Sequence, residues 1–157
     1  NESTTLNYCD RSVTYDKFTD DQKKDDLDER WPDLTTDPVV CKDKQSFWSY
    51  EYRKHGSCCS DIYNRDQYFD LAMALKDRFD LLKSFRKHRF IPGSSYTIQK
   101  INSTILAVTR GVPNISCSKV MELEQIGICF DRTAKSVIHC PHPKTCNPTR
   151  NNGIMFP

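Results

Sequence analysis

Eight cysteines in a chain of 157 residues constrain the fold more than any other feature of this sequence. They are scattered over positions 9, 41, 58, 59, 117, 129, 140 and 146, and no Cys-x-x-Cys pair occurs. Structural zinc sites usually show such close pairs of ligands, so the spacing argues against a zinc-binding domain. An even number of cysteines in a chain this small favours disulfides and an oxidising compartment.

Three Asn-x-Ser/Thr sequons agree with an extracellular protein. They begin at Asn1, Asn102 and Asn114, and each marks a candidate acceptor for an N-linked glycan. No apolar run approaches the roughly 20 residues that span a bilayer. No signal peptide is present, so we expect the mature form of a secreted glycoprotein that makes no contact with membranes.

The length suits a single domain, and a hydrophobic content of 37% is typical of a globular chain. Apolar residues at helical spacing predict helices over 45–55, 66–85 and 96–110. Very polar residues fill Tyr15–Arg30, which predicts an exposed helix or loop there. A loop then leads to a short apolar stretch at Val39–Cys41.

Beyond Asn114 the pattern shifts toward strands, which are predicted through Phe130 and over 136–140, with a turn over 131–135. The tail that follows is rich in Pro and Asn, and we expect it to be irregular and held by Cys146. Helices first and strands later indicate an α+β domain.

Charge is divided unevenly along the chain. Residues 1–80 carry 12 basic and 18 acidic side chains, whereas residues 81–157 carry 11 basic and 3 acidic ones. A basic half would attract a polyanion. Alternatively, the two halves neutralise each other on one folded surface.

The segment Phe47–Cys58, FWSYEYRKHGSC, holds the side chains that point to chemistry. Glu51, Lys54 and His55 fall within one helical turn and share a face. RNA cleavage without a metal needs a base for the 2′-hydroxyl, an acid for the leaving oxygen and positive charge for the phosphorane. A solvated salt-bridge face would give the same spacing, and a metal site would lack a third nearby ligand.

The segment resembles the active-site pattern F-W-x-x-E-W/Y-x-K-H-G-x-C of the T2 family of secreted ribonucleases. The positions that match it are Phe47, Trp48, Glu51, Tyr52, Lys54, His55, Gly56 and Cys58. The resemblance implies that His55 is a catalytic base and that Glu51 and Lys54 stabilise the phosphorane. It also implies cleavage of single-stranded RNA, not DNA, through a 2′,3′-cyclic phosphate, with no cofactor or metal.

Two further positions are implied to bind substrate. Phe47 matches a family position that makes an aromatic contact with a base. Tyr50 stands where many members carry a histidine, which places it at a position of phosphate contact in the family.

Other motifs resemble one branch of this family, the self-incompatibility ribonucleases (S-RNases) of the nightshade type. They are NYC at Asn7–Cys9, RWPDL at Arg30–Leu34 and the pair Cys58-Cys59. The resemblance implies a T2 fold, with helices and a central antiparallel sheet braced by disulfides. The implied pairs are Cys9–Cys58, Cys117–Cys146 and Cys129–Cys140, with Cys41 and Cys59 as a possible fourth.

In that branch, two variable stretches correspond to about Tyr15–Arg30 and Asp33–Val40. The resemblance implies that they form the surface read by pollen F-box proteins after secretion into the style matrix and entry into the pollen tube. The alternative is that these stretches are tolerant, solvated loops.

A second active-site segment of the family, H-G-L-W-P, does not occur in this sequence. None of His88, His139 and His142 lies in a context that fits the second catalytic histidine. We therefore expect an N-terminally incomplete domain whose polypeptide alone cleaves RNA weakly or not at all. The competing hypotheses are a non-catalytic recognition module and, less favoured, an unrelated disulfide-rich binder.

Overall fold

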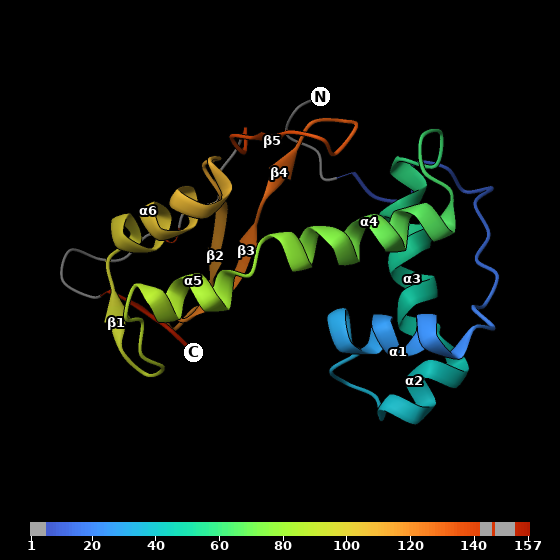
Figure 1. Cartoon of the computed structure of the whole chain (residues 1–157), viewed down its shortest axis with the longest axis horizontal. Helices are drawn as coiled ribbons and strands as arrows, with labels where there is room; N and C mark the ends of the chain where they lie inside the picture. The colour runs from blue at the N-terminus through green and yellow to red at the C-terminus, as the bar shows by residue number, and fades with distance from the viewer. Residues whose placement is uncertain (1–5, 142–145, 147–152) are drawn as a thin grey trace. The chain divides into compact units, whose positions relative to one another are not determined.

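The structure, a computed structural model, describes residues 6–141, 146 and 153–157 (Figure 1). Backbone packing divides the chain into two compact units, Asn1–Arg78 and Phe79–Pro157. Among the described residues, the first unit holds helices, and the second holds helices and short antiparallel strands. This confirms the α+β class, whereas the single domain stays a prediction. Within the same ranges, no helix is long and apolar enough to cross a bilayer.

The elements of the two units follow one another in chain order. The first unit contains α1 (Asp21–Arg30), α2 (Pro38–Lys44), α3 (Ser46–Lys54), the short 3₁₀ helix η1 (Gly56–Cys58) and α4 (Arg65–Arg78). The second contains α5 (Leu81–Lys87), β1 (Ser95–Tyr96), α6 (Ile98–Thr109), β2 (Asn114–Cys117), β3 (Leu123–Gly127), β4 (Cys129–Phe130), β5 (Val137–Ile138) and β6 (Ile154–Met155).

Side-chain caps decide where several helices begin. Asp20 accepts a hydrogen bond from the backbone of α1, and Asp37 does the same for α2, which starts at Pro38. Val39–Cys41 therefore lies in a helix that the sequence analysis did not predict. Asp80 caps α5 in the same way, so the helix predicted over 66–85 is two helices, α4 and α5. The break was not predicted because apolar residues keep helical spacing on both sides of it.

Aromatic side chains form the core of the first unit. Trp48 and Tyr52 from α3 are buried there together with Phe69 from α4. The Phe69 ring centroid lies 5.5 Å from that of Phe18 and 5.6 Å from that of Trp31. Edge and tilted contacts at such distances add to the stability that burial provides.

Gln45 lies between α2 and α3 and is almost fully buried, at 2% exposure. Its backbone is left-handed, with φ of 54°, so the chain turns there from one helix into the next. The side-chain oxygen accepts hydrogen bonds from Tyr15 Oη (2.7 Å) and Phe18 N (2.9 Å), and the amide nitrogen donates to Phe18 O (2.8 Å). One amide thus fastens the segment before α1 to the start of α3.

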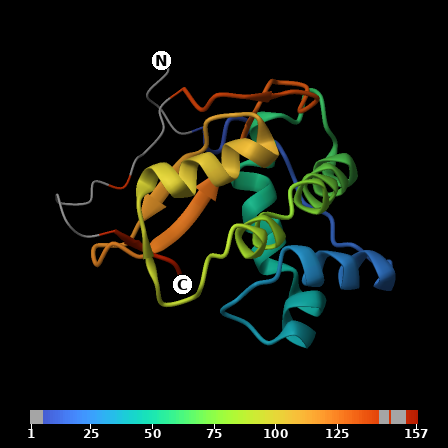
Figure 2. The ribbon, with the colours of Figure 1, turned by 60° about the vertical axis from the view of Figure 1, so that its left-hand side comes forward.

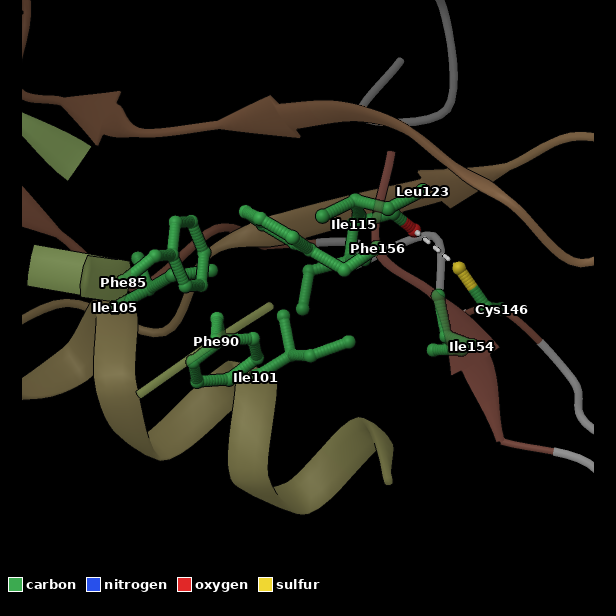
Figure 3. Close-up of a cluster of buried hydrophobic side chains, with 9 residues drawn as sticks. All are labelled: Phe85, Phe90, Ile101, Ile105, Ile115, Leu123, Cys146, Ile154 and Phe156. Carbon is green, nitrogen blue, oxygen red and sulfur yellow. Dashed lines mark hydrogen bonds between the residues drawn. The ribbon is translucent and has the colours of Figure 1, made fainter. Parts of the chain in front are cut away.

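In the second unit, α6 lies beside the β2–β3 pair (Figures 1 and 2). Within β2 and β3, Ile115 pairs with Ile126, and the register shifts between Ser116 and Cys117. Side chains from α5, α6, the strands and the last residues share one apolar core (Figure 3). Its buried members are Phe85, Phe90, Ile101, Ile105, Ile115, Leu123, Cys146, Ile154 and Phe156.

The described strands form three separate antiparallel pairs: β1 with β6, β2 with β3, and β4 with β5. The implied central sheet is therefore represented by small sheets within the described ranges. The predicted turn over 131–135 joins β4 to β5, as expected. The tail predicted to be irregular contributes β6, which pairs with β1 through Ile154 and Tyr96.

Three disulfides join the pairs that the family resemblance implied: Cys9–Cys58, Cys117–Cys146 and Cys129–Cys140. The possible fourth pair is wrong, because Cys41 and Cys59 are free thiols. Cys41 is buried in the aromatic core, while the Cys59 sulfur lies 3.4 Å from the Gly56 carbonyl oxygen. Burial raises the pKa of both thiols, which keeps them in the unreactive protonated form.

We expect Gln45→Leu to lower the free energy of unfolding by about 2 to 4 kcal/mol, because the buried N–H and C=O of Phe18 would lose their partners. Urea denaturation followed by circular dichroism measures this change. Gln22→Leu, at an exposed position in α1, is the control and should stay within about 0.5 kcal/mol of the parent. Equal stability of the two variants would contradict the assigned role.

Candidate active site

The helix α3 presents two different faces. Trp48 and Tyr52 lie four residues apart and are buried, so they fix how the helix rotates on the core. Glu51, Lys54 and His55 consequently lie toward the partly exposed side, as the spacing predicted. The site is thus built on a short helix whose orientation is set by burial of its aromatic side chains.

Glu51 and His55 form the pair that the sequence placed one turn apart. His55 Nε2 lies 3.8 Å from Glu51 Oε2, and the side chains are 38% and 18% exposed. The His55 backbone N–H also donates to the Glu51 carbonyl oxygen (2.8 Å), which closes the last turn of α3. An imidazole held beside a half-buried carboxylate can exchange a proton with a substrate that reaches its exposed edge.

Lys54 is coupled to Tyr50 on the same surface. Its ammonium nitrogen lies 5.1 Å from the Tyr50 ring centroid. A hydrogen bond with the Lys54 ammonium lowers the pKa of the Tyr50 phenol, and a hydrogen bond with Tyr8 lowers it further by a smaller amount. The same bond to Tyr50 raises the pKa of Lys54, so this side chain stays cationic. The site therefore keeps a fixed positive charge next to His55.

The segment around Tyr8 braces the end of α3. Cys9 is joined to Cys58, and the Tyr8 backbone N–H donates to the Lys54 carbonyl oxygen (2.7 Å). The bridge closes a loop of 49 residues, which is worth about 4 kcal/mol in the chain-entropy model. Covalent and hydrogen-bonded anchors thus hold the backbone at both sides of His55.

Gly56 follows the C-terminal cap of α3, where a glycine commonly adopts a left-handed conformation. Among the described glycines only Gly93 has a positive φ, so Gly56 needs no left-handed conformation. A Cβ on Gly56 would instead overlap the Tyr52 ring and lie 2.8 Å from its Cε2 atom. The glycine allows the chain after His55 to pass directly over a buried aromatic ring.

The other predicted positions are placed as follows. Phe47 is half-buried, and its ring stands edge-on to Trp31 at 6.4 Å, so part of the ring is used for packing. Asn102 is half-buried in α6, and Asn114 opens β2 opposite Gly127. Asn1 lies outside the described residues. Base contact by Phe47 and glycosylation at the three sequons stay predictions.

The remaining histidines have other surroundings. His139 Nδ1 accepts a hydrogen bond from Val112 N (2.9 Å), and His88 is the exposed C-terminal cap of α5. His142 lies outside the described residues. Across residues 6–141, 146 and 153–157, no group of three His, Cys, Asp or Glu side chains is arranged to hold a metal ion.

Sequence reasoning missed three residues beside the site. Tyr8 reaches Tyr50 with its phenol, and Arg11 and Arg53 line the same hollow as these two tyrosines. The spacing of Tyr50 and Arg53, three apart on α3, was a signal for Arg53. No pattern pointed to Arg11, because only the fold brings its segment to the helix.

Comparisons with known proteins identify the family of this chain. Residues 1–140 match the model of the ribonuclease T2 family, across both units. Ribonuclease S-7 of Nicotiana alata is 62% identical over all of this chain, which spans 73% of that relative. The chain therefore belongs to the ribonuclease T2 family.

Solved structures show the same fold. The gametophytic self-incompatibility associated SF11-RNase of Nicotiana alata superposes with a TM-score of 0.84 at 43% identity, over 92% of this chain and 76% of that one. RNase NT in complex with 5′-AMP gives a TM-score of 0.74 at 25% identity, over 96% and 74% of the two chains.

We expect Gly56→Ala to destabilise the protein by about 1 to 3 kcal/mol, because the new methyl group overpacks the site occupied by the Tyr52 ring. Combining it with Tyr52→Leu tests the cause. If the clash is with the ring, the double variant should lose less stability than the two single changes predict together. Additive losses in chemical denaturation would show that the ring is not what Gly56 accommodates.

We expect Lys54→Met to raise the pKa of Tyr50 toward that of an ordinary tyrosine, because the hydrogen-bonded ammonium that favours the phenolate is gone. Titration of ¹³C-labelled tyrosine by NMR, with Tyr50→Phe to assign the signal, measures the shift. In the parent, Tyr50 should ionise at a lower pH than exposed tyrosines. An unchanged Tyr50 titration in Lys54→Met would contradict the coupling.

Proposed function

We propose that this chain carries the catalytic helix of a ribonuclease that cleaves single-stranded RNA by transesterification. The observation that carries the proposal is the placement of Glu51, Lys54 and His55 on the partly exposed side of α3, in the pattern of the T2 family. A lone salt-bridge face would not require the braces at Cys58 and Gly56 that fix this helix end.

In the proposed reaction, His55 Nε2 takes the proton of the ribose 2′-hydroxyl while that oxygen attacks the neighbouring phosphorus. The bond from phosphorus to the 5′-oxygen breaks, and a 2′,3′-cyclic phosphate forms. The Lys54 ammonium offsets the charge of the phosphorane, and Glu51, to which the family pattern also assigns stabilisation of the phosphorane, lies 3.8 Å from His55 Nε2. The leaving oxygen needs a proton from a second acid.

The second acid is the role that the family resemblance gives to the histidine of H-G-L-W-P, which this sequence does not contain. Residues 1–78 hold His55 as their single histidine. The polypeptide of this sequence alone should therefore cleave RNA orders of magnitude more slowly than a form that includes the motif. The alternative function, a recognition module without catalysis, predicts no activity in either form.

A role in self-incompatibility is the second part of the proposal. It rests on the similarity to the S ribonucleases of Nicotiana alata, and it implies secretion into the style and recognition by a pollen F-box protein. The stretch 33–40 suits a recognition surface, because Leu34 is 91% and Val39 73% exposed. Apolar side chains in water at such positions favour association with a protein.

The decisive experiment compares three proteins in the presence of EDTA: this chain, the chain extended by a segment containing H-G-L-W-P, and the extended form with His55→Ala. We expect only the extended parent to cleave single-stranded RNA efficiently and to release 2′,3′-cyclic phosphate ends. Loss of the base should lower the rate about a thousandfold. Lys54→Ala should lower it about a hundredfold.

His88→Ala in the extended form is the matched control, because His88 is exposed and lies outside the helix α3. Its rate should stay within about twofold of the parent. An inert extended protein that is correctly folded and disulfide-bonded would reject the enzyme and favour the recognition module. Equal activity with and without His55 would reject its role as base.

A further inference from the structure

A hollow of about 450 Å³ lies next to the catalytic helix and has no part in the reaction described above. Its lining comes from two segments of the first unit: Tyr8, Asp10, Arg11, Val13, Tyr50 and Arg53. We call it the Tyr8–Arg53 hollow. Its volume is within the range of sites that bind small organic molecules.

The charges of the hollow favour an anion. Arg11 and Arg53 contribute two guanidinium groups, and both residues are exposed to solvent. Asp10 contributes one carboxylate, whose Oδ1 accepts hydrogen bonds from Ser12 N (2.8 Å) and Ser12 Oγ (2.6 Å). The lining therefore keeps an excess of positive charge, and guanidinium groups match the geometry of phosphate oxygens.

The aromatic rings favour a ligand with a flat face. Tyr8 and Tyr50 are 47% and 44% exposed, and their side chains are hydrogen-bonded to each other. The Lys54 ammonium lies 5.1 Å from the Tyr50 ring centroid, and the exposed part of this ring is open to a planar ligand. Bases of single-stranded nucleic acids stack on such rings without regard to sequence, while basic side chains follow the phosphates.

We propose that the Tyr8–Arg53 hollow is a subsite for a further nucleotide of the bound RNA, beyond the two nucleotides joined by the phosphate that meets Lys54 and His55. Tyr50 links the two places, because it lines the hollow and is hydrogen-bonded to Lys54. A base stacks on the tyrosines, and its phosphate lies between Arg11 and Arg53. This inference rests on the proposed ribonuclease function and extends it from a single phosphate to a longer strand.

The test measures binding instead of cleavage, so the missing histidine does not affect it. Fully 2′-O-methylated RNA of two and of five nucleotides cannot be cleaved, because the attacking hydroxyl is blocked. Fluorescence anisotropy gives the Kd of each for the parent chain and for Arg11→Ala/Arg53→Ala. We expect the double variant to bind the pentanucleotide at least tenfold more weakly and the dinucleotide within twofold of the parent.

Two further measurements sharpen the comparison. The slope of log K against log salt for the pentanucleotide should fall by about 0.7 in the double variant, the value for one lost phosphate contact on a single strand. Lys44→Ala removes a positive charge at the opposite end of α3, where Lys44 pairs with Asp43. It should leave the affinity for both lengths within about twofold of the parent.

The possible outcomes distinguish failure of the subsite from failure of the proposed ribonuclease function. Unchanged pentanucleotide binding in the double variant, or an equal loss for both lengths, would overturn the subsite while leaving the ribonuclease function intact. Failure of the parent chain to bind either oligonucleotide would overturn the subsite and count against RNA as the ligand. Circular dichroism spectra matching the parent would show that the variants fold, which is expected because both arginines are exposed.

Discussion

The burial of Trp48 and Tyr52 is the constraint on which the orientation of the helix α3 depends. Both rings are buried in an aromatic core that also contains Phe18 and Phe69, and their burial fixes which face of α3 is turned toward that core. The other side of the same helix then carries the carboxylate, the ammonium and the imidazole. A helix of this length is not stable alone in water, so its packing, not its propensity, positions the site.

Three interactions from outside the helix hold the C-terminal end of α3. The Cys9–Cys58 bridge, the hydrogen bond from Tyr8 N to Lys54 O and the close passage of Gly56 over Tyr52 act on the same few residues. Together they fix the backbone that carries His55. They also bring the segment of Tyr8 to α3, so the Tyr8–Arg53 hollow is a consequence of the brace.

Electrostatics in this protein are local rather than global. The first 80 residues carry more acidic than basic side chains, yet the candidate site inside them is dominated by Lys54, Arg53 and Arg11. Several acidic residues of α1 are paired with lysine or arginine, as in the bridges of Lys24 with Asp21 and of Lys42 with Asp25. Net charge of a segment is therefore a poor guide to where an anionic substrate binds.

The sequence by itself determined that Glu51, Lys54 and His55 share a face of α3, because residues three and four apart on a helix must share a face, and the family pattern assigned the three disulfides that form. It did not determine the break at Asp80 or the buried amide of Gln45, because a cap or a buried polar side chain is defined by backbone partners that spacing does not reveal. Tertiary structure alone decided that Cys41 and Cys59 stay apart, that Gly56 serves close packing, and that Arg11 joins Tyr50. For Cys41, Cys59 and Arg11 this depends on contacts between segments distant in the chain, which local patterns do not record. Gly56 packs on Tyr52, only four residues away, but the spacing does not reveal how closely the backbone passes the ring.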